Sequence, residues 1–299
     1  DFTGKKFKFE FTGFSIEKPK YDEYFAKEKK LTYEATLKAK VKLTNKTLNV
    51  EKEQEVFMTE IPMMTNHGTF VISGVERVIV PQLARSFGVF FTKIEVKGKP
   101  AFGAKIIPSR GAWIEIETDA DKVIYVRIDR KRKFSVASLL RAFGAETDSE
   151  IFDLFKGNAD AKEYIEKSIA KDHAKTAGES FVEIYRRLRD GDLATAENAK
   201  EFFKNLFDVE RYDLQRVGRF RFNSRFGLPT SGKEFDRRTL NLEDIKLVVN
   251  EIIKLNNTPD ATEDDVDHLG SRRVRYVGEM MQQKFRMGMA QIKRNMQNK

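Results

Sequence analysis

The 299-residue sequence contains no cysteine, which excludes disulfide bonds and metal sites built on thiolates. It has only three histidines, and none stands at ligand spacing from another. No apolar run approaches the roughly eighteen residues that cross a bilayer, and no charged start leads into an apolar signal core. We therefore expect no membrane segment, and the lack of cysteine is typical of a cytoplasmic protein.

The sequence does have a basic excess. It contains 55 lysines and arginines against 46 acidic residues, a formal net charge of +9. Such a surface suits a polyanionic partner such as nucleic acid, although many basic proteins never contact one. Hydrophobic residues make up 40% of the chain, enough for globular packing, and its length allows two domains. The start at Asp1, without an initiator methionine, indicates an excised fragment.

The first part of the chain shows the alternation of half-buried β-strands. Apolar and polar residues alternate over 31–43, and two further strands are expected to begin at Glu55 and Thr69. Polar and glycine-containing dipeptides between these segments predict turns. Later strands are predicted at 104–108, 112–117 and 123–128.

From residue 135 onward the pattern becomes helical, because apolar residues recur three and four positions apart. Helices are predicted at 135–143, from Ser149, at 181–188, at 196–207 and at 242–253. The last helix is predicted from Ser271, which would place Arg272, Arg273 and Arg275 in its first turn. A helix dipole disfavours cations there, so these arginines indicate either an anionic partner or pairing with Asp264 to Asp267 across the loop. The fold class is α+β.

No complete active site is recognisable. The chain has no phosphate-binding glycine loop followed by Lys-Ser or Lys-Thr, and no nucleophile elbow. Potential metal ligands are dense only at Asp264, Asp265, Asp267 and His268. This spacing lacks the glycine-hinged pattern of a calcium loop, so we interpret it as an acidic loop that leads into a basic helix.

Two features suggest contact with nucleic acid. The run 127–133 contains Arg130, Lys131 and Arg132, which are suited to backbone phosphates. Alternatively, it is a solvated patch partly matched by Asp129. The only tryptophan, Trp113, follows an Arg-Gly-Ala segment; it either fills a core or stacks on an unpaired base.

Five segments, in order along the chain, carry a family resemblance. They are residues 53–91, 106–113 (IIPSRGAW), 126–133 (VRIDRKRK), 211–219 (RYDLQRVGR) and 264–280 (DDVDHLGSRRVRYVGEM). With them, essentially the whole chain resembles the N-terminal part of the β subunit of bacterial DNA-directed RNA polymerase. The resemblance implies a β-rich protrusion, residues 1–75 and 276–299, with a mixed, helix-rich lobe, residues 76–275, inserted into it.

The family's activity is template-directed nucleotidyl transfer by the assembled enzyme. The resemblance implies that this chain forms one wall of the DNA cleft, contacts downstream and non-template DNA, and carries no catalytic residue. It also implies no cofactor or metal here, since another subunit binds the Mg²⁺ of the whole enzyme. The implied partners are DNA and the β′, α and σ subunits, in the bacterial cytoplasm.

The resemblance also implies a single-strand pocket. The matching residues are Arg85, Trp113, Val266, Asp267 and Arg272. In the family, this pocket binds the non-template strand at the downstream edge of the bubble. Trp113 would stack on a base, and Asp267 and Arg272 would help to hold a flipped-out guanine. Apart from the pocket, the charge of Arg273 makes it a further candidate for a phosphate contact.

Two other sets of residues match family surfaces. Arg77, Val80 and Gln82 match positions that flank the rifampicin pocket. Residues Glu51, Lys52 and Glu53 match a patch that docks transcription-repair coupling factor and CarD-like regulators. Two departures are notable, because Glu51 replaces an aliphatic residue and Phe87 replaces a proline that would fix φ in its turn.

Three functional hypotheses follow. The first is a DNA-guiding piece of the polymerase, and the second is a docking module for a regulator. The third is an independent, basic single-strand-binding protein. Salt-sensitive DNA binding supports the first, and tight, salt-tolerant binding to a regulator supports the second.

Overall fold

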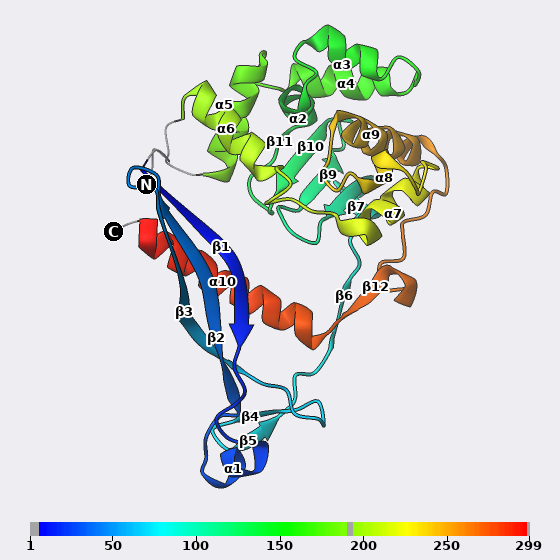
Figure 1. Ribbon diagram of the computed structural model, residues 1–299. Coiled ribbons are helices and arrows are strands. Elements are labelled where there is room, and N and C mark those ends of the chain that lie inside the picture. Colours follow the sequence, from blue (N-terminus) through cyan, green and yellow to red (C-terminus); the bar gives the residue numbers. More distant parts are fainter. Residues whose placement is uncertain (1–5, 190–193, 298–299) are drawn as a thin grey trace. The chain divides into compact units, whose positions relative to one another are not determined.

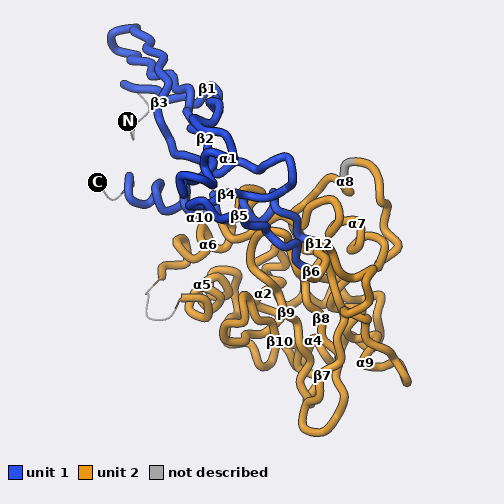
Figure 2. Tube along the Cα trace, turned by 90° about the horizontal axis from the view of Figure 1, so that it is seen from below, with its two compact units in different colours: residues 1–82, 275–299 blue, residues 83–274 orange. Residues whose placement is uncertain are grey.

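The computed structural model describes residues 6–189 and 194–297. The chain forms two compact units, one made of residues 1–82 and 275–299 and the other of residues 83–274 (Figure 2). The predicted division was after residues 75 and 275. Both units contain helices and antiparallel sheets, so the mixed composition expected of an α+β protein is confirmed.

Unit 1 is built on a three-stranded antiparallel sheet in the order β1-β2-β3 (Figure 1). The alternation over 31–43 produces its central strand, in which Ala35 and Ala39 are buried. The second strand begins earlier than predicted, because β2 turns directly into β3 with Asn45 opposite Val50. The elements of unit 1 are β1 (Phe7–Ile16), α1 (Glu23–Glu28), β2 (Glu34–Asn45), β3 (Val50–Pro62), β4 (Phe70–Ile72), β5 (Val75–Arg77) and α10 (Val277–Gln297).

Unit 2 is organised around a five-stranded antiparallel sheet in the order β11-β10-β9-β8-β7. Its central strands are rich in isoleucine and valine, and those side chains form the main core. Its strands are β7 (Gly88–Val96), β8 (Lys99–Ile107), β9 (Ile114–Thr118), β10 (Ile124–Ile128) and β11 (Phe134–Ser135). The segments at the unit boundary, β6 (Gln82–Arg85) and β12 (Arg272–Arg275), form a separate two-stranded sheet.

Helices pack around the sheet of unit 2 (Figure 1). The longest, α9, begins at a capping box formed by Asn241 and Asp244 and buries an aliphatic stripe in the main core. The predicted helix from Ser149 is capped by Thr147, because Glu150 completes a capping box with that threonine. The helices are α2 (Val136–Phe143), α3 (Asp148–Leu154), α4 (Ala161–Ala170), α5 (Ala177–Leu188), α6 (Ala196–Leu206), α7 (Gln215–Arg225), α8 (Lys233–Asp236), α9 (Leu242–Asn257) and the short 3₁₀ helix η1 (Leu269–Ser271).

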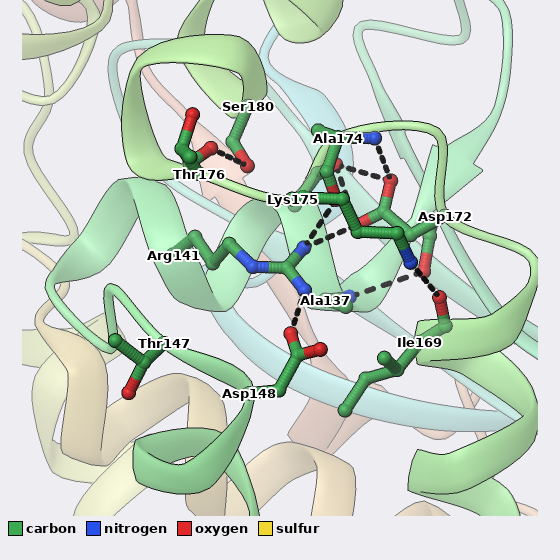
Figure 3. Close-up of polar contacts among 12 residues, drawn as sticks. Ala137, Arg141, Thr147, Asp148, Ile169, Asp172, Ala174, Lys175, Thr176 and Ser180 are labelled. Atoms are coloured by element: carbon green, nitrogen blue, oxygen red, sulfur yellow. Dashed lines mark hydrogen bonds and ion pairs between the residues drawn. The ribbon is translucent and has the colours of Figure 1, made fainter.

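The helical part of unit 2 contains a buried ion-pair network centred on Arg141 (Figure 3). Its guanidinium donates to the Asp172 carboxylate at 2.6 Å and to the Ala174 carbonyl at 3.0 Å, and it also pairs with Asp148. Ser138 donates to the same Asp172 carboxylate at 2.8 Å. The network therefore joins α2 to α3 and to the segment between α4 and α5.

The prediction for the last helix was partly wrong. The segment that contains Arg272, Arg273 and Arg275 is strand β12, and α10 begins only at Val277. These arginines therefore do not lie in a first helical turn, and the argument from the helix dipole does not apply. Pairing with β6 holds this segment extended.

Candidate nucleic-acid site

A small apolar cluster in unit 2 brings together residues from three distant segments. Phe87, Phe90 and Ile107 are buried at its centre, and the half-buried side chains of Trp113 and Val266 pack against them. Two residues of the predicted pocket, Trp113 and Val266, thus share one support. Phe87, for which the resemblance suggested a proline, is held here by packing in the cluster.

Trp113 is clamped by the turn that follows β10. The Asp129 carboxylate accepts a hydrogen bond from the backbone N–H of Trp113, and the backbone N–H of Asp129 donates to the Trp113 carbonyl, both at 2.9 Å. Asp129 and Arg130 both have positive φ, 50° and 58°, and Lys131 N–H closes the turn on the Ile128 carbonyl at 3.0 Å. Two successive left-handed residues define a type I′ turn, which is uncommon without glycine. This turn places the Arg130 guanidinium 5.4 Å from the centre of the Trp113 ring.

The segment before Trp113 packs against another of the family-like segments. Asp213 exchanges backbone hydrogen bonds with Ser109 and Arg110. Gly111 has a φ of +115°, and a Cβ there would lie 2.7 Å from the Tyr212 ring. Only glycine suits such a position. The segments 106–113 and 211–219 therefore form one scaffold behind the tryptophan.

The scaffold continues into helix α7. A Cβ at Gly218 would lie 3.0 Å from the Cβ of Phe87, so the glycine permits close packing beneath the aromatic cluster. Arg219 is buried and donates two hydrogen bonds to Asp244, at 2.9 and 3.0 Å. Burial raises the pKa of the Tyr212 hydroxyl above its ordinary value. The family-like sequence 211–219 is thus structural in this chain.

The acidic residues 264–268 are held as an ordered loop on β7. The Asp264 carboxylate accepts from the Phe91 N–H at 2.8 Å, and Asp264 N–H donates to the Phe91 carbonyl at 2.9 Å. The Asp265 carboxylate accepts from the backbone N–H groups of Asp267 and His268. Arg221 donates to the Gly270 carbonyl at 2.5 Å. These carboxylates therefore hold the loop in place. Among the described residues, no group of three or more His, Cys, Asp or Glu could hold a metal ion.

Two of the three charged residues of the predicted pocket lie at the end of this loop and at the start of β12. Asp267 and Arg272 form an ion pair at the exposed end of the loop, next to Val266. The neighbouring Arg273 lies over the ring of Phe87, 4.1 Å from its centre. Arg85 is exposed on β6, the strand paired with β12. The pocket residues are thus carried by the aromatic cluster and by the strand and loop beside it.

Three of the four predicted phosphate contacts lie in or directly after the turn that holds Trp113, while Arg273 lies on β12. Arg130, Lys131 and Arg132 are all exposed, in the turn after β10. The sequence suggested that Asp129 balances this run, but its carboxylate binds the Trp113 backbone. It was not predicted from the sequence that Asp129 holds the Trp113 backbone. The only signal for this role was the position of Asp129 directly after β10, whose last residue pairs with Ile114 next to the tryptophan.

The remaining predicted residues belong to unit 1. Arg77, Val80 and Gln82 are exposed in the segment from the end of β5 to β6. Glu51, Lys52 and Glu53 are exposed on β3, an outer strand of its sheet. They lie directly opposite Thr44, Leu43 and Lys42 on the neighbouring strand β2. A hydrogen bond from Lys42, at 2.6 Å, lowers the pKa of the Glu51 carboxyl.

None of the helices within residues 6–189 and 194–297 is both long and apolar enough to cross a membrane.

Comparison with known proteins gives one consistent result. Residues 88–275 match the family model described as RNA polymerase Rpb2, domain 2. Three proteins named DNA-directed RNA polymerase subunit beta are similar to the chain, and each alignment covers 98% of its length. These come from Syntrophomonas wolfei (44% identical over 296 residues, 26% of that protein), Dehalococcoides mccartyi (42% over 301, 24%) and an Exiguobacterium species (37% over 379, 32%).

The chain spans about a quarter to a third of the length of these relatives. The alignment with the Exiguobacterium protein covers 379 residues, more than the 299 of this chain. That relative therefore carries inserted residues that this chain lacks.

Proposed function

Because the chain belongs to the bacterial RNA polymerase β subunit family, we propose that it forms one wall of the DNA cleft in an assembled DNA-directed RNA polymerase. Unit 1 corresponds to the protrusion and unit 2 to the lobe. The match of residues 88–275 to domain 2 supports the second assignment. The chain serves nucleotidyl transfer by guiding DNA, while the catalytic centre and its Mg²⁺ belong to other parts of the enzyme.

The cluster shared by Trp113 and Val266 carries this proposal. A half-buried indole on an apolar support is suited to stacking on an unpaired base. Asp267, the residue after Val266, forms an ion pair with Arg272. The pair offers a carboxylate acceptor next to guanidinium donors. Guanine presents N–H donors and the O6 acceptor on its Watson–Crick edge, so this pair complements guanine better than the other bases.

Basic residues around the indole would contact the backbone of the strand. Arg130 lies over the Trp113 ring, and the exposed Lys131 and Arg132 follow it in the chain, while Arg85 and Arg273 lie on strands β6 and β12. Each phosphate neutralised by such a residue releases counterions, so affinity falls as salt rises. The proposed ligand is therefore the non-template single strand, held by stacking and by charge.

Titration of the 299-residue chain with single-stranded oligonucleotides tests this function, because Trp113 is the only tryptophan. We expect saturable quenching of its emission, with an apparent affinity that decreases as salt increases. An oligonucleotide containing guanine should bind more tightly than oligothymidine, and Asp267→Ala should reduce that difference. An unchanged emission at all salt concentrations would refute base stacking at Trp113.

A second function rests on the surface of unit 1. Strand β3 is 13 residues long, lies at one side of its sheet, and exposes Glu51, Lys52 and Glu53. An edge strand can pair with a strand of a partner, and its charged side chains restrict that pairing to a partner of complementary charge. We propose docking of transcription-repair coupling factor or a CarD-like regulator here. Lys52→Glu should weaken binding of that factor in a pull-down at high salt and leave oligonucleotide binding unchanged; equal capture by both chains would contradict this docking site.

A third surface is proposed from the family match alone. Arg77, Val80 and Gln82 would flank the rifampicin pocket, whose main part would come from other residues of the β subunit. Their exposure in the chain is compatible with this role.

A further inference from the structure

The Trp113 ring already has a charged partner. Its side chain packs against the buried Phe87, Phe90 and Ile107. The Arg130 guanidinium lies over the ring, 5.4 Å from its centre, and the rest of Arg130 is exposed. This distance is within the range of a cation–π contact. A base could not stack on the covered face while Arg130 remains there.

The position of Arg130 is built into the turn. Asp129 and Arg130 both adopt left-handed backbone conformations, which non-glycine residues rarely do. Two hydrogen bonds of 2.9 Å tie Asp129 to the backbone of Trp113 itself. The turn is therefore fixed to the backbone that carries the indole. Only the flexible side chain of Arg130 is free to leave the ring, since its three rotatable methylenes extend from a fixed Cα.

We infer that Arg130 is a removable cap on Trp113, which the incoming base of a single strand replaces. The released guanidinium then pairs with a phosphate next to that base. This inference rests on the proposed stacking function of Trp113. An exposed cation–π contact changes an equilibrium by about two- to five-fold, whereas stacking of a base changes it by roughly five- to 150-fold. The exchange therefore favours the base.

Arg130→Gln and Lys131→Gln form a matched pair of variants. Each removes one positive charge from the same exposed turn and keeps a side chain of intermediate length. Only the first removes the group that lies over Trp113. A capped ring therefore predicts a difference between the two variants, whereas a purely electrostatic role of the turn predicts none. Far-UV circular dichroism establishes that both variants fold like the parent chain.

The first readout needs no nucleic acid. Acrylamide quenching of Trp113 emission measures how accessible the ring is. We expect stronger quenching in Arg130→Gln than in the parent chain, and parent-like quenching in Lys131→Gln. Equal quenching in all three chains would overturn the cap, whatever the nucleic-acid results.

The second readout is the binding of labelled oligothymidine, followed by fluorescence anisotropy over a range of salt concentrations. Both variants should lower the slope of log affinity against log salt by about one, because each loses one phosphate contact. At equal salt, Arg130→Gln should bind about two- to five-fold more tightly than Lys131→Gln, because no cap has to be displaced. Equal affinities, or weaker binding by Arg130→Gln, would overturn the exchange. If the parent chain binds no oligonucleotide, the stacking function and the exchange both fail, and acrylamide quenching alone decides whether the cap exists.

Discussion

The network around Arg141 predicts a large loss of stability when the arginine is removed (Figure 3). Its side chain is fully buried, and the side chain of Asp172 is only 2% exposed. In Arg141→Leu, the Asp172 carboxylate would keep its hydrogen bonds from Ser138 and from the Ala174 N–H, but it would have no counter-charge. The Ala174 carbonyl would also lose a donor. Removing one partner of a buried ion pair costs about 3–5 kcal/mol, so the free energy of unfolding should fall by that amount.

Urea denaturation, followed by far-UV circular dichroism and Trp113 fluorescence, measures this effect. The double variant Arg141→Leu/Asp172→Asn should recover part of the loss, because the amide needs no counter-charge. Lys167→Met is the control, since it breaks an exposed pair with Glu163 and should cost less than about 1 kcal/mol. The reasoning is refuted if Arg141→Leu costs no more than the control, or if the double variant is no more stable than the single one.

Three further predictions concern the scaffold and the charges of unit 2. The Tyr212 hydroxyl is buried with no hydrogen-bond partner among the described residues. Tyr212→Phe should therefore raise the free energy of unfolding, measured by urea denaturation at pH 7, by up to about 1–3 kcal/mol. Because burial raises its pKa, the parent chain should lose stability as pH rises above about 10, and the variant should lose less; parallel pH profiles would contradict this. Gly111→Ala should lower the stability of the fold more than Gly98→Ala does. Both glycines have positive φ, but only an alanine at 111 would clash, with the Tyr212 ring. Equal shifts in melting temperature would exclude the clash. Hydrogen bonds from Lys122 and Lys167 lower the pKa of Glu163, so its stabilising effect is present above about pH 4.5 and is lost as pH falls through the lowered pKa. Glu163→Gln should therefore reduce the acid dependence of stability, and an unchanged profile would count against these contacts.

Local sequence patterns predicted the strands and helices whose apolar spacing or capping residues can be recognised without knowing what the element packs against. Strand β2 and helices α2, α6 and α9 were predicted in this way, and the structure confirms them. Strand β7 was missed, because its first half is an unbroken apolar run that does not alternate. Helix α7 was missed because it buries Arg219 and Asn223 where a helical pattern would have apolar residues.

The candidate site depends on contacts that sequence spacing does not encode. Nothing in the local pattern places Val266 on the same cluster as Trp113, because only the packing of the loop on β7 brings them together. The cap depends on two left-handed residues, Asp129 and Arg130, neither of which is a glycine that would have signalled the turn. The family resemblance supplied the pocket residues, and the structure adds the supports that hold them.

The most direct test of the central claim is the binding of a labelled, guanine-containing single strand to Trp113→Ala, measured by fluorescence anisotropy. Loss of one stacked base is worth about 1–3 kcal/mol, so the variant should bind roughly five- to 150-fold more weakly than the parent chain. Tyr24→Ala, which removes an aromatic side chain that is 70% exposed in unit 1, is the control and should bind like the parent. Equal affinities of Trp113→Ala and the parent chain would contradict the claim that this indole receives an unpaired base.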